Sequence, residues 1–268
     1  MIVALLASLG LTDVPHGTTT PDVRPEAPTR IVFMGDSLTD VEGMDTPFPM
    51  YPELLVSNDA RWWPGAEGQD LVSVYPSLAV VHNVAVGGSV SSALRWQLRE
   101  LEAREGAGPQ RGETLVVIST GGNDVLESMD PFAIPEITRG ITANLRRVKG
   151  ALEARYPDGM HLYVANIPDP TGAGDAGEPR CWEPEQAVYL DEMVNAINGR
   201  MRAAGESEGY GVVDYYGLVR DHGYGGLGVD AADPLAADPV HWYMDCVHPN
   251  ARGNDALRHL FLEAIVGG

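Results

Sequence analysis

The chain has 268 residues, and its 38 acidic side chains against 18 basic ones give a formal net charge of −20 at pH 7. Proteins that bind nucleic acids or anionic membranes neutralise phosphate groups with a basic surface, which so acidic a chain lacks. The charge therefore excludes both classes of partner. The 44% of hydrophobic and 21% of charged residues indicate a soluble globular protein with a substantial core.

The N-terminal segment resembles a secretory signal followed by a tether. Residues 1–11 are uncharged and mostly apolar, and residues 12–29 are rich in Thr, Pro and Asp. Because a basic N-terminal part and an Ala-x-Ala cleavage site are absent, we interpret residues 1–29 as a signal remnant and tether, with a short core helix as the alternative. We expect a secreted or extracytoplasmic protein, with a cytoplasmic location as the alternative, and a folded domain over residues 30–268. No run reaches the roughly 20 apolar residues of a membrane-spanning helix, so we expect no stable membrane insertion.

From residue 30 onwards, short apolar runs alternate with longer segments of helical periodicity. The runs have the length and the Val and Ile content of buried strands, and they cover residues 31–34, 80–86, 114–119, 161–167 and 211–214. Helices are predicted over residues 91–105, 135–156, 183–204 and 251–266. Repeated strand, helix, strand units predict right-handed crossovers, and hence one three-layer α/β domain with a parallel sheet flanked by helices.

Three segments interrupt this alternation, at residues 41–77, 169–179 and 220–238. The last two are rich in Gly, Ala, Asp and Pro and are predicted to be surface loops. The first contains Trp62 and Trp63, for which two interpretations stay open. They either anchor a packed loop or bind substrate, where their flat rings suit acyl chains or sugar rings.

Reactive side chains follow the predicted strands. Gly35-Asp36-Ser37-Leu38 comes after the first strand, Gly87-Gly88 after the second and Gly121-Gly122-Asn123-Asp124 after the third, while Asp245 to Asn250 precede the last helix. In an open α/β sheet, a ligand binds beyond the carboxyl ends of the strands. We therefore expect these four segments to meet in one site.

Ser37, His248 and Asp245 have the chemistry of a nucleophile, a base and an orienting acid. A serine hydroxyl becomes a good nucleophile when an imidazole takes its proton, and a carboxylate holds that imidazole in the right tautomer. The spacing of Asp245 and His248 on a tight turn lets the carboxylate reach one ring nitrogen and leaves the other facing outward. His241 is the rival base, and the alternative for Ser37 is a helix N-cap.

Three groups are candidate donors to the negative charge that develops on a carbonyl oxygen under attack. They are the backbone N–H of Ser37, the backbone N–H of Gly88 and the side-chain amide of Asn123. Such a donor is commonly worth about 3 to 4 kcal/mol in the transition state. The alternatives are that Asn123 is a turn residue and that Gly88 is a left-handed turn glycine.

The four segments together resemble the SGNH hydrolases, also called the GDSL esterase/lipase family. Gly35-Asp36-Ser37-Leu38 is similar to the nucleophile block, Asn83 to Gly88 to the glycine block, Gly121 to Asp124 to the GxND block and Asp245 to Asn250 to the DxxHPN block, in the family's order. The resemblance frames residues 30–266 and implies a flavodoxin-like sheet. It also implies ester hydrolysis through an acyl-enzyme, with a Ser-His-Asp triad, a Ser/Gly/Asn oxyanion hole, no metal and no cofactor. The family's spacing from Asn83 favours Gly88 over Gly87 as the oxyanion glycine.

The first expectation is thus a serine esterase or lipase acting on a small-molecule, lipid or carbohydrate ester. A carbohydrate acetyl esterase that uses the same residues is the alternative, followed by a non-catalytic carbohydrate- or surface-binding module on a hydrolase fold. Asp40 and Glu42 raise a further alternative, a metal site or a glycosidase-like carboxylate pair, which leaves the Asn and His blocks unexplained. The sequence leaves the oligomeric state open.

The two cysteines, Cys181 and Cys246, are too few for a disulfide scaffold or a four-thiolate zinc site. They form either one disulfide or two buried thiols. In a secreted protein, a disulfide between them would tie the segment that holds Asp245 and His248 to the body of the domain. Closing a loop of about 65 residues would stabilise the fold by roughly 4 kcal/mol.

Overall fold

The computed structural model describes residues 17–21, 23–169, 171, 181–220, 222 and 241–267. The signal-like run at residues 1–11 and nearly all of the two loops predicted at residues 169–179 and 220–238 lie outside the described residues. Within the described part of the chain, no helix combines the length and the apolar character needed to cross a bilayer.

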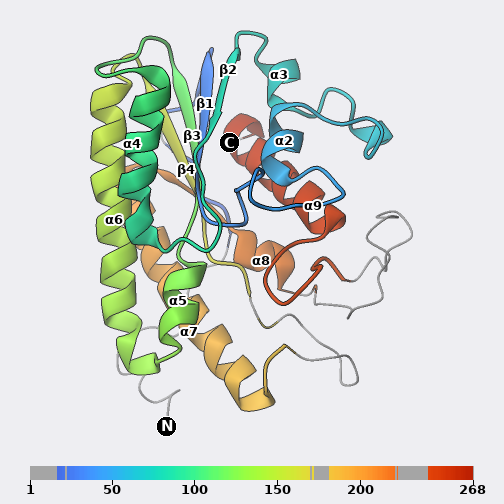
Figure 1. The fold of residues 1–268 in the computed structure, drawn as a ribbon, viewed down its shortest axis with the longest axis vertical. Coiled ribbons are helices and arrows are strands. Elements are labelled where there is room, and N and C mark those ends of the chain that lie inside the picture. Colours follow the sequence, from blue (N-terminus) through green and yellow to red (C-terminus); the bar gives the residue numbers. More distant parts are fainter. Residues whose placement is uncertain are drawn as a thin grey trace.

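A five-stranded parallel sheet forms the centre of the domain, with the strand order β2-β1-β3-β4-β5 (Figure 1). This flavodoxin-like order confirms the fold class predicted from the sequence. Because the chain passes from β1 to β2 on one side and then to β3 on the other, the order reverses between β1 and β3. The strands are β1 (Arg30–Gly35), β2 (Val80–Asn83), β3 (Thr114–Ser119), β4 (Met160–Ala165) and β5 (Gly211–Val213).

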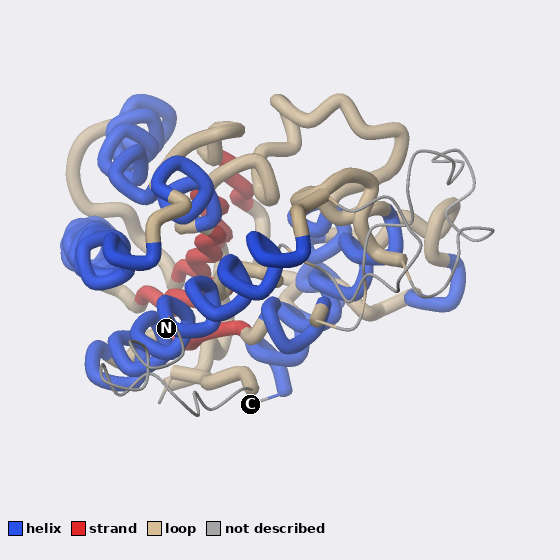
Figure 2. Tube along the Cα trace, turned by 90° about the horizontal axis from the view of Figure 1, so that it is seen from below, coloured by secondary structure: helices blue, strands red, loops and turns tan. Residues whose placement is uncertain are grey.

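Helices cover both faces of the sheet, as Figure 2 shows from below. Val32 and Met34 of β1 point toward α4, α6 and α7, whereas Ile31 and Phe33 point toward α2, α8 and α9. All four side chains are buried, which explains why the strand is continuously hydrophobic and does not alternate with polar residues. The helices are α2 (Tyr51–Val56), α3 (Leu71–Val74), α4 (Leu94–Glu105), α5 (Gly122–Ser128), α6 (Ile134–Arg155), α7 (Pro184–Glu208), α8 (Tyr215–Val219) and α9 (Ala251–Leu262).

The long helices follow from their hydrophobic periodicity. In α6 the buried apolar residues recur every three, four or seven positions, and they form the stripe that faces the sheet. Helix α7 extends four residues beyond the predicted end at Ala204, through Gly205. A Cβ atom on Gly205 would lie 2.5 Å from the Val212 side chain, so a glycine is needed there for α7 to approach β5. The helix ends before Gly209, whose φ of 74° is left-handed.

The segment expected to be a tether packs against the domain where it is described. The backbone N–H of Thr19 donates to Val212 O at 2.8 Å, and the Thr19 side chain accepts from the Val212 N–H at 2.9 Å. Further along, the N–H of Ala27 donates to the Glu113 carboxylate at 2.6 Å. Strand β5 lies at the edge of the sheet, and an edge strand presents backbone groups that need partners. Thr19 provides such partners to β5, and the described residues 17–21 and 23–29 therefore lie against the domain.

Candidate active site

The site lies where the strand order reverses, beyond the carboxyl ends of β1 and β3. Gly35 ends β1 with a φ of 133°, and a Cβ atom there would lie 1.9 Å from Ser119 O, so only glycine allows β1 to pass so close to β3. The buried Gln97 side chain of α4 accepts from the Gly35 N–H at 2.8 Å and donates to the Gly35 carbonyl at 2.6 Å. The contacts of Gly35 with β3 and α4 therefore hold the start of the turn that carries Ser37 in place.

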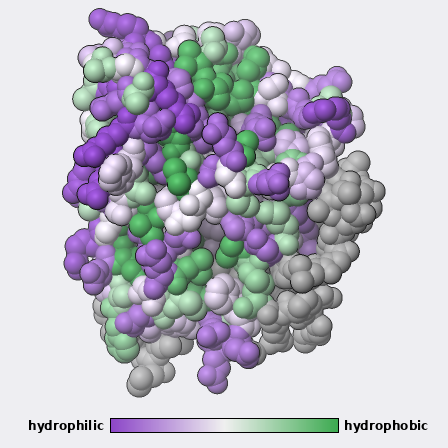
Figure 3. Space-filling view, viewed as in Figure 1, coloured by the Kyte–Doolittle hydropathy of each residue, from purple (hydrophilic) through white to green (hydrophobic). Residues whose placement is uncertain are grey.

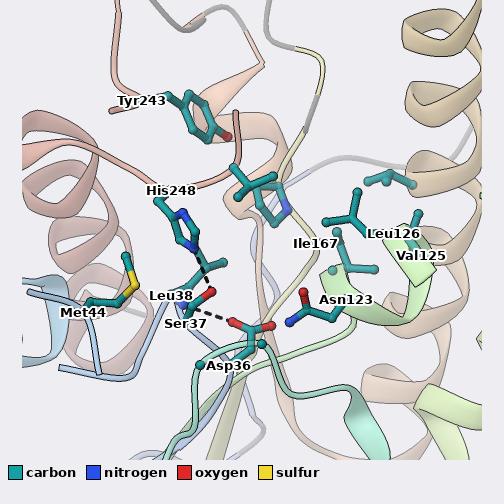
Figure 4. Close-up of a pocket in the computed structure, with 16 residues that line it drawn as sticks. Asp36, Ser37, Leu38, Met44, Asn123, Val125, Leu126, Ile167, Tyr243 and His248 are labelled. Atoms are coloured by element: carbon teal, nitrogen blue, oxygen red, sulfur yellow. Dashed lines mark hydrogen bonds between the residues drawn. The ribbon is translucent and has the colours of Figure 1, made fainter. Parts of the chain in front are cut away.

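The structure brings Ser37, His248 and Asp245 together in one hydrogen-bonded series. The Nε2 atom of His248 lies 2.8 Å from Ser37 Oγ, a contact that Figure 4 shows as a dashed line. Its Nδ1 atom lies 2.7 Å from Asp245 Oδ2. A carboxylate only accepts hydrogen bonds, so Nδ1 carries the ring proton and Nε2 is left to accept the Ser37 hydroxyl proton. This arrangement can raise the nucleophilicity of Ser37 Oγ.

The segment before α9 holds His248 in place. The N–H of Met244 donates to His248 O at 2.9 Å, and the N–H of Asn250 donates to Trp242 O at 2.8 Å, which closes a tight turn around the histidine. The Asn250 side chain then caps α9 by accepting from the N–H groups of its first turn. His241, the rival base, is not among the residues that line the cavity at Ser37.

Asp245 is ionised near neutral pH. Burial alone would raise its pKa, but hydrogen bonds from the His248 ring and from the backbone N–H groups of Val247 and His248 outweigh this effect, and the pKa lies below its ordinary value. Among the described residues, no group of three or more His, Cys, Asp or Glu side chains has the arrangement of a metal site.

Asp36 lies beside Ser37, and its pKa is shifted in the opposite direction to that of Asp245. Its side chain is buried and accepts from the Leu38 N–H at 3.1 Å. Burial raises its pKa from 3.8 to about 7, opposed by the Leu38 hydrogen bond and the nearby His248 and assisted by the negative charge of Asp124. Asp36 therefore binds a proton near neutral pH, while Asp245 does not.

The three candidate oxyanion donors border the same cavity. Within the described residues, the N–H groups of Ser37 and Gly88 have no hydrogen-bond acceptor. Asn123 donates one amide hydrogen to Ser89 O at 3.0 Å, and Figure 4 shows its side chain on the side of the cavity that faces Ser37. The N–H of Gly87, in contrast, already donates to Asp40 Oδ2 at 2.7 Å.

The cavity at Ser37 has a volume of about 350 Å³ and is mostly apolar. Its wall comes from α5, α7, the segment after β4 and the segment before α9. The sequence analysis did not predict that these elements enclose an apolar cavity. The short helix α5 begins at Gly122, directly after Gly121, where the sequence predicted no helix. The apolar side chains that line the cavity are Leu38, Met44, Val125, Leu126, Ile167, Pro168, Tyr243, Val194 and Val247.

The structure does not bring Trp62 and Trp63 to this cavity. Trp62 packs edge-on against Phe48, with ring centroids 6.4 Å apart, and borders a separate hollow. The N–H of Trp63 donates to Asp59 O at 2.9 Å, and its carbonyl accepts from Asn58. Both residues lie in a folded turn between α2 and α3, which agrees with the packed-anchor alternative.

Cys181 and Cys246 form a disulfide that spans 65 residues of sequence. Cys181 lies just before α7, and Cys246 lies between Asp245 and His248. The disulfide therefore joins the segment that carries Asp245 and His248 to the start of α7, the helix that forms one wall of the cavity.

Known proteins resemble this chain in sequence pattern and in fold. A model of the GDSL-like Lipase/Acylhydrolase family matches residues 33–256. Phospholipase A1 from Streptomyces albidoflavus NA297 is 17% identical, with a TM-score of 0.56 over 90% of this chain and 99% of that chain. An acetylxylan esterase from Geobacillus stearothermophilus is 18% identical, with a TM-score of 0.54 over 91% and 97%. An extracellular lipase from Streptomyces rimosus is 16% identical, with a TM-score of 0.54 over 89% and 99%.

At these identities the structural similarity establishes the shared fold. No curated protein is similar enough to the chain to count as a relative.

Removing the disulfide should destabilise the protein. In the Cys181→Ser/Cys246→Ser double variant, the free energy of unfolding in urea should fall by about 4 kcal/mol, because the unfolded chain regains the freedom of a long loop. Wild-type protein unfolded with a reductant should give the same lower value. Two titratable thiols in denatured, unreduced wild-type protein would contradict the disulfide.

Asp36 should make stability fall as the pH rises. Between about pH 4 and pH 7 the folded protein keeps a proton on Asp36 that the unfolded chain has released, so folding loses on the order of 4 kcal/mol across this window. Asp36→Asn carries a neutral amide and lacks this loss. The free energy of unfolding of Asp36→Asn, minus that of wild type, should therefore rise from pH 4 to pH 8. A difference that does not change with pH would show that the Asp36 pKa is not raised.

Proposed function

The chain belongs to the GDSL-like lipase/acylhydrolase family and is a carboxylic ester hydrolase, and we propose that Ser37, His248 and Asp245 carry out the hydrolysis through an acyl-enzyme. The observation that carries this proposal is the hydrogen-bonded series from Asp245 through His248 to Ser37. Family membership also argues against the non-catalytic binding module.

In the first step, Ser37 Oγ attacks the ester carbonyl while His248 Nε2 takes the hydroxyl proton. Asp245 stabilises the imidazolium that forms and keeps the ring in position, as its hydrogen bond to Nδ1 supports. The imidazolium then gives the proton to the leaving alcohol. In the second step a water molecule repeats the sequence on the acyl-enzyme, which releases the acid and restores Ser37.

We assign the oxyanion hole to the N–H groups of Ser37 and Gly88 and to the Asn123 amide. Two observations support Gly88 over Gly87. The N–H of Gly88 borders the cavity without an acceptor among the described residues, whereas Asp40 accepts the hydrogen bond of the Gly87 N–H. Free donors held in advance near the reacting carbonyl stabilise the transition state because they need no reorganisation.

The acyl group of the substrate enters the apolar cavity. Val125, Leu126, Ile167 and Val194 offer side chains that bury hydrocarbon and present no charge to it. This lining supports an esterase or lipase for apolar acyl groups. Phospholipase and lipase activities are properties of the Streptomyces proteins named above, and the apolar lining is what supports lipid esters as substrates of this chain.

We also propose that the protein acts outside the cytoplasm. The disulfide between Cys181 and Cys246 supports this location, because disulfides form and persist in oxidising compartments.

Ser37→Ala should abolish the hydrolysis of p-nitrophenyl acetate. Loss of the serine nucleophile from a Ser-His-Asp triad lowers kcat by about 10⁴-fold or more, because the remaining groups cannot form the acyl-enzyme. The control is Ser128→Ala, which changes an exposed serine at the end of α5 and should retain full activity. An unimpaired Ser37→Ala protein would end the proposal.

Asn123→Ala should lower kcat by roughly 10²- to 10³-fold and change KM little, because an oxyanion donor acts mainly in the transition state. Steady-state kinetics with p-nitrophenyl acetate measure both constants. A rise in KM with kcat unchanged would show that Asn123 binds the substrate ground state and does not serve the oxyanion.

A further inference from the structure

Helix α5, which carries Asn123, is weakly anchored by its own sequence. It is seven residues long, and its N-cap residue, Gly121, has no side chain to cap the first turn. Val125 is the one residue of α5 that is buried, and Figure 3 shows hydrophobic and hydrophilic residues interspersed over the part of the surface where Figure 1 places α5. So short a helix has little stability of its own. Contacts from outside α5 therefore have to hold Asn123 in place.

Asp124, the neighbour of Asn123, supplies such a contact. Its Oδ2 atom accepts from the Ser91 N–H at 2.7 Å, and its Oδ1 atom accepts from the Ser91 hydroxyl at 2.6 Å. We call these two hydrogen bonds the Asp124–Ser91 clamp. The Asn144 side chain of α6 donates to the same hydroxyl oxygen at 3.0 Å. Ser91 is fully buried, and hydrogen bonds are electrostatically stronger there than in water. The clamp therefore ties the start of α5 firmly to the loop that follows β2.

Ser89 lies in the same loop and links it to the oxyanion donors. Its carbonyl oxygen accepts from the Asn123 amide at 3.0 Å. Its hydroxyl oxygen lies 2.7 Å from Val86 O within the loop and 3.1 Å from Gly35 O, so the hydroxyl proton has an acceptor on both sides. Ser89 therefore connects the end of β1 with the start of α5.

The hydrogen bond to Ser89 O decides which way the Asn123 amide faces. A carbonyl oxygen only accepts, so the amide has to present its NH₂ group to it. The Nδ2 atom carries two hydrogens, and the second is left for the oxyanion on the side of the cavity that Figure 4 shows. The Asp124–Ser91 clamp joins the two segments next to this hydrogen bond, so it keeps Ser89 O and the amide at a constant separation.

We propose that Asp124 and Ser91 are positioning residues for ester hydrolysis, which act through Asn123 by holding its amide ready for the oxyanion. This inference rests on the proposed hydrolysis at Ser37 and on the assignment of Asn123 to the oxyanion hole. Neither Asp124 nor Ser91 is among the residues that line the cavity at Ser37, so neither contacts the substrate. An oxyanion donor stabilises the transition state when it is held in place before the reaction. The clamp therefore raises kcat and leaves substrate binding unchanged.

The first test separates the hydrogen bonds of Asp124 from its charge. In Asp124→Ala, kcat for p-nitrophenyl acetate should fall about tenfold with KM little changed, which is part of the roughly 10²- to 10³-fold loss expected for removing the donor itself. Asp124→Asn also removes the charge but keeps both hydrogen bonds, because the amide can accept from the Ser91 N–H and donate to the Ser91 hydroxyl oxygen. It should retain most of kcat. The control is Glu127→Ala, which removes an exposed acidic side chain from the same helix and should leave kcat unchanged.

A double-mutant cycle tests whether the clamp acts through Asn123. When Asp124→Ala is added to Asn123→Ala, kcat should fall by less than about twofold, because the amide that the clamp positions is already absent. Ser91→Ala keeps the Asp124 carboxyl group and loses one of the two hydrogen bonds. It should lower kcat by a smaller factor than Asp124→Ala does, and it should likewise have little effect in the Asn123→Ala background. This variant completes the cycle if Asp124→Ala does not fold.

A loss of kcat that is equally large with and without Asn123 would overturn the inference, because it would show a general structural effect. Equal losses in Asp124→Asn and Asp124→Ala would also overturn it, since the charge and not the hydrogen bonds would then matter, and so would an unchanged kcat in Asp124→Ala. In these three cases the proposed function still stands. If Asn123→Ala keeps full kcat, or Ser37→Ala stays active, the proposed function itself fails and the inference falls with it.

Discussion

The hydrogen bond between Ser37 Oγ and His248 Nε2 joins two segments that are 211 residues apart, and the surrounding structure serves to keep it short. On one side, the close passage of β1 along β3 and the clamp of Gln97 on Gly35 fix the turn that carries Ser37. On the other side, the Asn250 cap of α9 and the disulfide at Cys246 restrain the segment that carries His248. A hydrogen bond over this separation depends on rigid anchors at both ends, because a loose loop would lose it to conformational entropy.

Two carboxyl groups near this hydrogen bond show how their surroundings decide their charge. Asp245 is half-exposed and accepts three hydrogen bonds, which hold its pKa low, whereas Asp36 is buried with one such bond, so its pKa is raised. In the proposed mechanism, the ionised Asp245 orients the imidazole of His248. Asp36 lies beside the proposed oxyanion donors, and its protonated form avoids a second negative charge that would oppose the charge that develops in the reaction. The net charge of −20 acts at longer range, disfavouring anionic substrates and repelling the carboxylate product.

Sequence reasoning located the buried strands and the long helices because these elements carry continuous or periodic hydrophobic patterns. The helices α2, α3, α5 and α8 were missed, since four to seven residues are too few to show a helical period. The contacts of Trp62, Trp63 and residues 17–29 depend on tertiary neighbours, which no local pattern encodes. For the candidate site, the motif spacing predicted which side chains meet, but the roles of Gln97 and Asp40 as anchors of the two loops became visible only with the hydrogen bonds in place.

The most direct test of the account is covalent labelling of the protein with a fluorophosphonate, followed by mass spectrometry of its peptides. Such a probe reacts with a serine whose proton is taken by a neighbouring base. The account predicts a single adduct on Ser37, formed rapidly in wild-type protein and far more slowly in His248→Ala. Labelling of a different serine, or labelling of Ser37 at the same rate without His248, would contradict it.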